Sequence, residues 1–387
     1  MDQPSNGNRH SHGAWKRFVY QGLPLTGALF LFFLAIKLLT GAFSLLGSES
    51  AEALLQVAEN PFIGLFLGIL ATAIVQSSSV TTSMIVTIVA AGQLSLSSAV
   101  PMIMGANIGT SVTSTIIALG YIGNRNEYQK AFAGATLHDL FNIITVVLVL
   151  GLELGFGLLS SASAWMASLI TPRIGVQVDG FLFFLSDLAN FIIQTTATSS
   201  NPQGNAVLSL ILGIIGVLGS LQLLSTLLKK FIIGRIQRNL DHYIFGSPFR
   251  SLLAGFVTTA AVQSSSVTTS LMVPLVATSK VSLTRAFPFL MGANIGTTTT
   301  TLMAAIFVGA HAPALAQASL AIAFAHVLFN LFGVLVMFPF ERIRLIPVRI
   351  ARRLGMLTLE SRFYGVLYVV GFFFLLPMLL IWLFQVL

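Results

Sequence analysis

The stretch Gln76-Ser77-Ser78-Ser79-Val80-Thr81-Thr82-Ser83 decides the fold of this chain, because residues 263–270 repeat it letter for letter. The two copies lie 263 − 76 = 187 positions apart. Both copies interrupt long apolar stretches, at 61–92 and at 248–279. Chance does not place two identical octapeptides in matching apolar surroundings, so the chain contains an internal duplication.

Two further motifs extend the duplication. Gly-Ala-Asn-Ile-Gly-Thr occurs at 105–110 and again at 292–297, with the same offset of 292 − 105 = 187. His-x-Leu-Phe-Asn occurs at 138–142 and at 326–330, with a slip of one residue. We therefore place the two repeat units at 60–152 and 247–340.

The composition indicates that the chain folds in a membrane rather than in water. Of 387 residues, 55% are hydrophobic and 8% are charged, against about 25% charged in an ordinary soluble domain. The mean hydropathy is +0.90. The chain is therefore expected to be a polytopic membrane protein. This class excludes most soluble enzymes, nucleic-acid binders and scaffolds. The absence of cysteine excludes disulfides, thiolate metal sites and cysteine nucleophiles.

The apolar pattern predicts an all-α polytopic membrane protein. A spanning helix needs about 20 apolar residues, and we expect such helices at 22–46, 98–120, 131–152, 206–228, 286–308, 317–339 and 363–386. The stretches 61–92 and 248–279 are expected to form re-entrant or broken-helix hairpins, because each octapeptide breaks its stretch. Each repeat then has one hairpin and two spans, and further transmembrane helices flank the repeats.

This reading divides the chain into six parts. They are a disordered cytoplasmic tail (1–20), a first transmembrane helix with an external loop (21–59), repeat 1 (60–152), an external segment with a linking transmembrane helix and a basic cytoplasmic loop (153–246), repeat 2 (247–340), and a basic loop with a final transmembrane helix (341–387).

The basic residues predict that the repeats are inverted. Cytoplasmic loops are enriched in Lys and Arg. With a cytoplasmic N-terminus, every basic cluster falls on the cytoplasmic side, and repeat 2 starts from the face opposite to repeat 1. Inverted repeats are typical of secondary transporters, whose sites lie near the bilayer midplane. The 15 residues from Pro61 to Gln76 give a helical rise of roughly 22 Å, so the hairpin tips should meet there.

The chemistry of the tips suits an oxyanion together with a small hard cation. Hydroxyl groups both donate and accept hydrogen bonds, and main-chain N–H groups at a helix start bind anions. The candidate phosphate-binding residues are Gln76, Ser77, Ser78, Ser79, Gln263, Ser264, Ser265 and Ser266. Asn107 and Asn294 add carbonyl oxygens. Neither motif contains Lys or Arg, so Na⁺ is expected to supply the counter-charge transiently.

Other interpretations of the same residues stay open. Ser, Thr and Gly also hold membrane helices together, and the polar tips also suit a passive ion channel or facilitator. A hydrolase with Ser78 or Ser265 as nucleophile needs a base and an oxyanion hole, and no Gly-x-Ser-x-Gly elbow is present; we expect no enzyme. His138 and His326 fit packing histidines. The spacing of Gly64 and Gly68 allows a homodimer contact.

The doubled Gln-Ser-Ser-Ser, the doubled Gly-Ala-Asn-Ile-Gly-Thr and the segment 131–139 (Ala-Phe-Ala-Gly-Ala-Thr-Leu-His-Asp) resemble the type II sodium-dependent phosphate cotransporter family. The resemblance implies Na⁺-driven uptake of inorganic phosphate, with substrate and sodium sites at the hairpins. It also implies electrogenic transport, because Ala133, Ala135 and Asp139 match the pattern of electrogenic members. Asp139 then supplies the carboxylate of an additional sodium site, with Asn142 and Thr115 as ligands.

The resemblance completes the list of expected site residues. Candidate sodium ligands are Asp139, Asn142, Thr115, Asn107, Thr110, Asn294, Thr297 and Thr300, and Arg125 is a candidate phosphate ligand from the cytoplasmic side. The family pattern Gln-x-Gly-Asp-Arg is replaced here by Tyr121-Ile122-Gly123-Asn124-Arg125, which alters two expected sodium ligands.

The remaining expectations concern partners and location. The partners are phosphate, Na⁺ and the lipid bilayer, with no nucleic acid and no cofactor beyond Na⁺ as coupling ion. A Na⁺ symporter for another small oxyanion is the alternative. The short loops and the lack of cysteine indicate a bacterial inner membrane.

Overall fold

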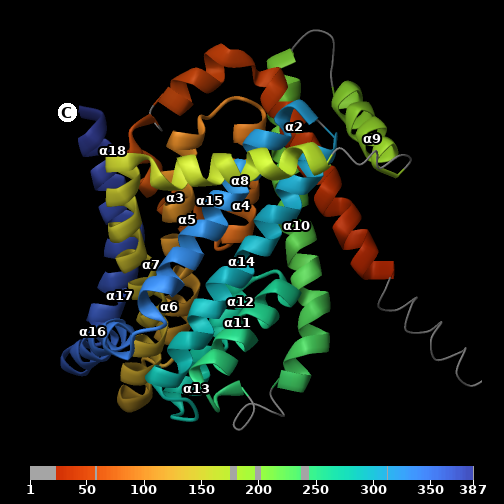
Figure 1. Ribbon diagram of the computed structural model, residues 1–387. Coiled ribbons are helices and arrows are strands. Elements are labelled where there is room, and N and C mark those ends of the chain that lie inside the picture. Colours follow the sequence, from red (N-terminus) through yellow and green to blue (C-terminus); the bar gives the residue numbers. More distant parts are fainter. Residues whose placement is uncertain are drawn as a thin grey trace, which may run out of the picture.

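The computed structural model describes residues 23–56, 59–174, 181–196, 202–236, 244–311 and 313–386. These residues form helices joined by short turns, and no strand occurs among them. Figure 1 shows the helices gathered around a central group that contains α4 (Ser78–Ala90), α12 (Ser265–Ser270) and α14 (Leu283–His311). The tail predicted at 1–20 lies outside the described residues.

Six of the described helices are long and apolar enough to cross a membrane. They cover Leu23–Ala42, Leu96–Leu119, Arg125–Phe156, Ala206–Leu224, Leu315–Met337 and Phe363–Val386. The chain is thus a multi-pass membrane protein, as predicted. The seventh expected span, 286–308, is helix α14 (Leu283–His311). Its threonine-rich stretch makes α14 less apolar, and α14 packs against α11 (Pro248–Val262) and α15 (Pro313–Met337).

Both octapeptides break a helix at the predicted place. Helix α3 (Pro61–Val75) stops before Gln76, and α4 (Ser78–Ala90) starts after Ser77. In the second copy, α11 (Pro248–Val262) is followed by the short helices α12 (Ser265–Ser270) and α13 (Met272–Ala277). A side-chain oxygen caps each first helix, from Asn60 and from Ser247, and a proline follows at the first helical position.

Each hairpin packs on the next helix of its own repeat through glycine. Helix α3 lies against α5 (Leu96–Thr110), and α11 lies against α14. A Cβ atom on Gly105 would collide with the carbonyl oxygen of Leu65, and one on Gly292 would collide with that of Leu252. The motif Gly-Ala-Asn-Ile-Gly-Thr therefore serves close backbone approach. Gly68 likewise abuts Met102 of the same chain, so its contact is internal and the homodimer stays a prediction.

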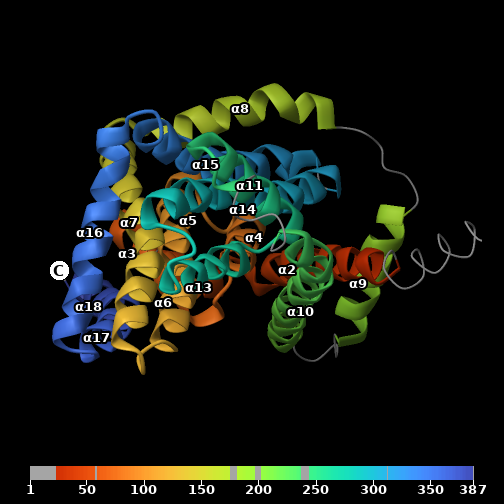
Figure 2. The same cartoon turned by 90° about the horizontal axis from the view of Figure 1, so that it is seen from below.

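The long helices outside the repeats form one flank of the molecule. Helix α2 (Leu23–Gln56) packs along α10 (Pro202–Ile236), and α9 (Phe181–Thr196) contacts both. In the segment expected to be external, α8 (Leu158–Ile174) crosses one end of the bundle and packs on α15 (Pro313–Met337), as Figures 1 and 2 show. The expected first span also continues as helix to Gln56.

The basic segment after residue 341 is a helix rather than the predicted loop. Helix α16 (Glu341–Glu360) buries Val348, Ala351 and Gly355, and it packs on α7 (Arg125–Phe156). Its arginines at 342, 349, 352 and 353 remain exposed. The segment is amphipathic, and that pattern stabilises a helix lying on a neighbour. The final span consists of α17 (Phe363–Val370), a π-helical turn η4 (Gly371–Leu375) and α18 (Leu376–Val386).

The two hairpins begin at opposite ends of this final span. Phe62, at the start of α3, stacks on Phe384 near the end of α18, with ring centroids 5.2 Å apart. Pro248, at the start of α11, shares a cleft with Arg344 of α16, which leads into the beginning of α17. Inverted repeats predict this relationship, and their orientation in a membrane stays a prediction.

Candidate functional site

The two hairpin tips contact each other through reciprocal hydrogen bonds. The hydroxyl oxygens of Ser78 and Ser265 lie 3.3 Å apart. Ser79 donates to the carbonyl oxygen of Gln263 at 3.4 Å, and Ser266 donates to that of Gln76 at 3.3 Å. A local two-fold axis relating repeat 1 to repeat 2 would produce reciprocal contacts of this kind.

The backbone at each tip has the same unusual conformation. Gln76 and Gln263 both have φ of 56°, in the left-handed region, which costs a non-glycine residue about 1–2 kcal/mol. Ser77 and Ser264 then cap the second helices, accepting from the amides of Val80 and Val267. The strained turn ends the first helix and starts the second within two residues, so the first main-chain N–H groups of the second helix have no acceptor within that helix.

Five of the eight predicted phosphate residues line a cavity of about 270 Å³. They are Gln76, Ser77, Gln263, Ser264 and Ser266, and α10 contributes Leu218, Leu221 and Gln222. None of the described residues that line it carries a charge. The other three predicted residues, Ser78, Ser79 and Ser265, are buried at the contact between the tips.

Gln222 was missed by the sequence reasoning. It lies outside both repeats, so the duplication gives no signal for it. The only available signal was an amide side chain within the apolar span 206–228. Its place in the cavity follows from the packing of α10 beside the two tips.

The local symmetry continues into a second layer of hydroxyl pairs. Ser114 of α6 (Val112–Leu119) lies 3.1 Å from Thr269, oxygen to oxygen. The equivalent pair, with the roles of the two repeats exchanged, is Thr82 of the first hairpin and Thr301 of α14, whose hydroxyl oxygens lie 2.8 Å apart. These contacts join each hairpin to α6 or α14 of the opposite repeat.

A buried network of amide and imidazole groups lies behind the tips. His138 contacts the side-chain oxygen of Asn294, and His326 contacts that of Asn107 at 3.3 Å. Asn294 donates to the side-chain oxygen of Asn142 at 2.6 Å, and Asn142 donates to the main-chain oxygen of Asn107 at 2.8 Å. Three predicted sodium ligands thus come together, and their side-chain oxygens accept protein hydrogen bonds.

The predicted threonine ligands divide into two groups. Thr110, Thr115 and Thr297 donate to carbonyl oxygens of their own turn or of the turn before it. Thr300 instead donates to the side-chain oxygen of Gln263 at 2.6 Å. Thr300 is therefore the one of these four that contacts an octapeptide.

That contact makes the two tips unequal. Gln263 is held by Thr300 and also donates to Thr299 at 3.3 Å. In repeat 1 the corresponding Gln76 is exposed, and the hydroxyl of Thr113, which corresponds to Thr300, is buried without a hydrogen-bond partner. The two-fold relation is therefore broken at the glutamines.

Asp139 is fully buried in the middle of α7. Its Oδ2 atom accepts a hydrogen bond of 2.8 Å from the hydroxyl of Tyr368, while Oδ1 has no hydrogen-bond partner. Ser111, at the break between α5 and α6, lies beside the carboxyl group, but its hydroxyl donates to Ile108. Asp139 and Asn142 thus belong to separate hydrogen-bond clusters, and Thr115 donates to the main-chain oxygen of Ser111.

No cluster of His, Asp or Glu able to hold a metal ion occurs among the described residues.

Arg125 does not approach the tips. It is exposed at the start of α7 and donates to the carbonyl oxygen of Leu359, near the end of α16. The prediction that Arg125 binds phosphate therefore has no support in this geometry.

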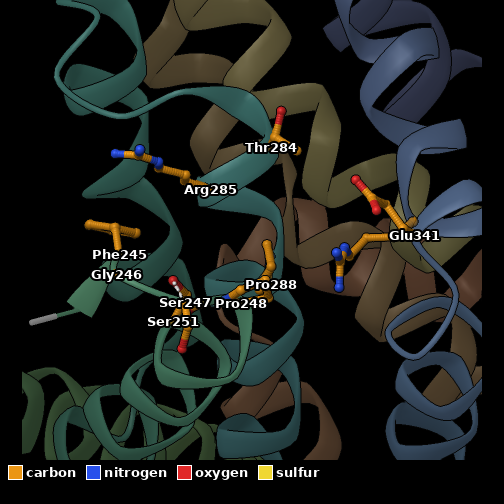
Figure 3. A pocket seen from close by; sticks show the side chains of 10 residues that line it. Phe245, Gly246, Ser247, Pro248, Ser251, Thr284, Arg285, Pro288 and Glu341 are labelled. Carbon is orange, nitrogen blue, oxygen red and sulfur yellow. Dashed lines mark hydrogen bonds between the residues drawn. The ribbon is translucent and has the colours of Figure 1, made fainter.

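A larger cavity of about 510 Å³ lies at the starts of α11, α14 and α16 (Figure 3). Arg285, Glu341 and Arg344 line it, together with polar residues that include Ser247 and Thr284. None of the predicted site residues is among the residues that line it. It is a charged surface cleft, separate from the paired tips.

Most of the chain matches one known protein family. The family model described as Na⁺/Pi-cotransporter matches residues 31–166 and 217–359. This chain belongs to the Na⁺/Pi-cotransporter family. It is 33% identical to the rat sodium-dependent phosphate transport protein 2A, over 92% of this chain and 66% of that protein. It is 30% identical to the human protein 2B, over 92% and 64%.

The Na⁺/Pi-cotransporter match covers both octapeptides, the asparagine network and Asp139. It leaves out 167–216 and the final span, in which Tyr368 lies. The chain spans slightly less than two thirds of the length of these relatives. No solved structure matches the chain significantly.

Proposed function

We propose that this protein is a secondary active transporter that takes up inorganic phosphate together with Na⁺. The observation that carries the proposal is the pair of identical tips, joined by reciprocal serine contacts beside an uncharged polar cavity. The Na⁺/Pi-cotransporter family and the sodium-dependent phosphate transport proteins 2A and 2B support the same substrate and the same ion.

The uncharged lining explains why a cation must accompany phosphate. Hydroxyl, amide and main-chain N–H groups can bind the oxygens of phosphate, but they do not neutralise its charge. A buried and unpaired anion is costly, so a bound Na⁺ stabilises phosphate in the cavity. Because Na⁺ dissociates, it releases phosphate as well, whereas a fixed arginine would retain it.

Alternating access is the proposed mode of transport. The two tips have the same sequence and are related by a local two-fold, yet Gln263 is held by Thr300 while Gln76 is exposed. We propose that a second state exchanges these conditions, with Gln76 bound to Thr113 and Gln263 exposed. Exchange between equivalent halves is the mechanism of inverted-repeat transporters.

The proposed sodium ligands are Asp139 and the oxygens around it, with Thr300 and Gln263 at the second tip. An ionised carboxylate at membrane depth is costly without a cation, and Asp139 has one oxygen without a partner. The residue of repeat 2 that corresponds to Asp139 is Val327, which has no oxygen in its side chain. An extra Na⁺ at repeat 1 alone would make transport electrogenic.

We also propose the setting of the protein. The basic end of the bundle faces the cytoplasm, the N-terminus is cytoplasmic, and the membrane is a bacterial inner membrane. No cofactor besides the coupling ion is needed. Two copies in a homodimer are compatible with these proposals, each with its own site.

Uptake of labelled phosphate into proteoliposomes tests the function. An inward Na⁺ gradient should drive accumulation, and an equal K⁺ gradient should not. Equal uptake with both cations would indicate a passive facilitator. Competition by sulfate stronger than by unlabelled phosphate would indicate another oxyanion as substrate.

A further inference from the structure

Tyr368 belongs to neither repeat, yet it contacts the buried carboxylate of repeat 1. It lies on α17, and its hydroxyl donates to Asp139 Oδ2 at 2.8 Å. A hydrogen bond from a hydroxyl to a carboxylate is stronger than one between neutral groups. It also fixes the orientation of the carboxyl group, because only one of the two oxygens receives it.

Aromatic neighbours hold the Tyr368 ring in place. Phe132 of α7 meets it edge-on at 5.5 Å between centroids, and Phe372 stacks on it at 5.4 Å. Phe373 also meets it edge-on, at 6.0 Å. Phe372 and Phe373 lie in the π-helical turn η4, and such turns are frequent at functional sites. The hydroxyl is therefore directed at Asp139 by packing.

The second carboxylate oxygen is left available by this arrangement. Asp139 Oδ1 is buried and has no hydrogen-bond partner. The hydroxyl of Ser111 nearby is committed to Ile108, at 2.6 Å. A buried oxygen of a carboxylate without a partner is costly, and a cation at Oδ1 would remove that cost.

We propose that Tyr368 is a positioning residue for Na⁺ binding: it holds Asp139 through Oδ2 so that Oδ1 is presented to the ion. This inference rests on the proposed function, because it assigns part of the sodium site of that transporter. It adds a residue from outside the duplicated units and from outside the residues matched by the family model.

The test is Tyr368→Phe, which removes the hydroxyl and keeps the ring. Without the hydroxyl, Oδ2 is buried without a partner and the carboxylate is free to turn. The Na⁺ concentration for half-maximal phosphate uptake should rise about tenfold, the size of effect that one hydrogen bond to a charged group produces. The phosphate concentration for half-maximal uptake, measured at saturating Na⁺, should stay within about twofold of wild type by the same conversion.

Tyr364→Phe is the matched control. Tyr364 lies one turn earlier on α17, and its side chain is 44% exposed. Removal of the Tyr364 hydroxyl should leave the Na⁺ dependence of phosphate uptake unchanged. An equal shift in both variants would attribute the effect to the helix as a whole and would overturn the proposal.

A double-mutant cycle with Asp139→Ala separates positioning from general packing. If Tyr368 acts through Asp139, Tyr368→Phe should add no further change once the carboxylate is absent. The same tenfold shift in the Asp139→Ala background would overturn the proposal, as would an unchanged Na⁺ dependence of Tyr368→Phe alone.

A binding measurement keeps this inference distinct from the proposed function. A ligand that binds the native state raises the unfolding temperature, so purified wild-type protein should be stabilised by Na⁺ relative to K⁺. Tyr368→Phe should need about tenfold more Na⁺ for the same rise. If wild type shows this rise but no Na⁺-driven uptake, the proposed function fails and the role of Tyr368 stands. If wild type shows no rise, both fail.

Discussion

The hydroxyl oxygens of Ser78 and Ser265 lie 3.3 Å apart, although 187 positions separate them in the sequence. Each serine is the same letter of the same octapeptide, so the contact joins equivalent positions of the two repeats. The neighbouring contacts, from Ser79 to Gln263 and from Ser266 to Gln76, are reciprocal about it. A duplicated sequence has thus produced one shared site rather than two separate ones.

Loss of either central serine should impair transport. Ser78→Ala and Ser265→Ala each remove the contact between the tips, and we expect uptake to fall several-fold, up to about tenfold, the range for one neutral hydrogen bond. Phosphate uptake at subsaturating phosphate measures the effect. Ser161→Ala, at an exposed position on α8, is the control. Near-normal uptake in both tip variants would contradict a site at the paired tips.

Gln222 should matter for phosphate although it lies outside the repeats. Gln222→Leu keeps the size of the side chain and removes its amide from the cavity lining. We expect the phosphate concentration for half-maximal uptake to rise by about threefold to tenfold, because phosphate then binds with one neutral hydrogen bond fewer. Gln194→Leu on α9, also an exposed glutamine, should behave as wild type. If the phosphate concentration for half-maximal uptake is unchanged in Gln222→Leu, then Gln222 of α10 does not contribute to phosphate binding.

Asp139 should determine the charge carried per phosphate. Moving one elementary charge through 100 mV changes the free energy by about 2.3 kcal/mol, so electrogenic uptake must respond to a K⁺ diffusion potential. Wild type should transport faster with an inside-negative potential. Asp139→Ala should transport more slowly and lose this voltage response. Equal voltage dependence in the two proteins would show that the extra Na⁺ binds elsewhere.

The glycines of the second copied motif should determine stability rather than transport chemistry. In Gly292→Ala the new Cβ atom meets the carbonyl oxygen of Leu252, and overpacking of this kind costs about 1–3 kcal/mol. Thermal unfolding in detergent should show a lower midpoint. Gly151→Ala, where an added Cβ meets nothing within 4 Å, should be neutral or stabilising, because alanine favours helix. A midpoint for Gly292→Ala equal to that of Gly151→Ala would contradict the close packing of α11 on α14.

The absence of cysteine allows a direct test of topology. Glu59→Cys, just before the first hairpin, should react with an impermeant thiol reagent added outside cells. Ser361→Cys, between α16 and α17, should react only after the membrane is opened. Both side chains are exposed, so access to the reagent depends on the side of the membrane. Labelling of both from one side would rule out the proposed orientation.

The sequence alone determined the membrane class, the duplication and the positions of the helix breaks. Apolar runs of about 20 residues and repeated polar octapeptides are local features, and the backbone must follow them because lipid offers no hydrogen-bond partners. Six of the seven expected spans correspond to helices apolar enough to cross a membrane. The loop predicted after residue 341 is a helix, because apolar residues every third or fourth position pack on α7 and outweigh the basic composition.

Only the tertiary structure decided which residues share the site. Arg125 carries the right charge for phosphate, but from the start of α7 it bonds the end of α16, whereas Gln222 and Tyr368 come from helices that the duplication does not mark. It also decided that Gln263 is held while the identical Gln76 is exposed. Contacts between distant segments depend on how whole helices pack, and neither the spacing nor the identity of the residues specifies that packing. The local sequence therefore determines which chemical groups the tips carry, and the packing of whole helices determines which residues contact them.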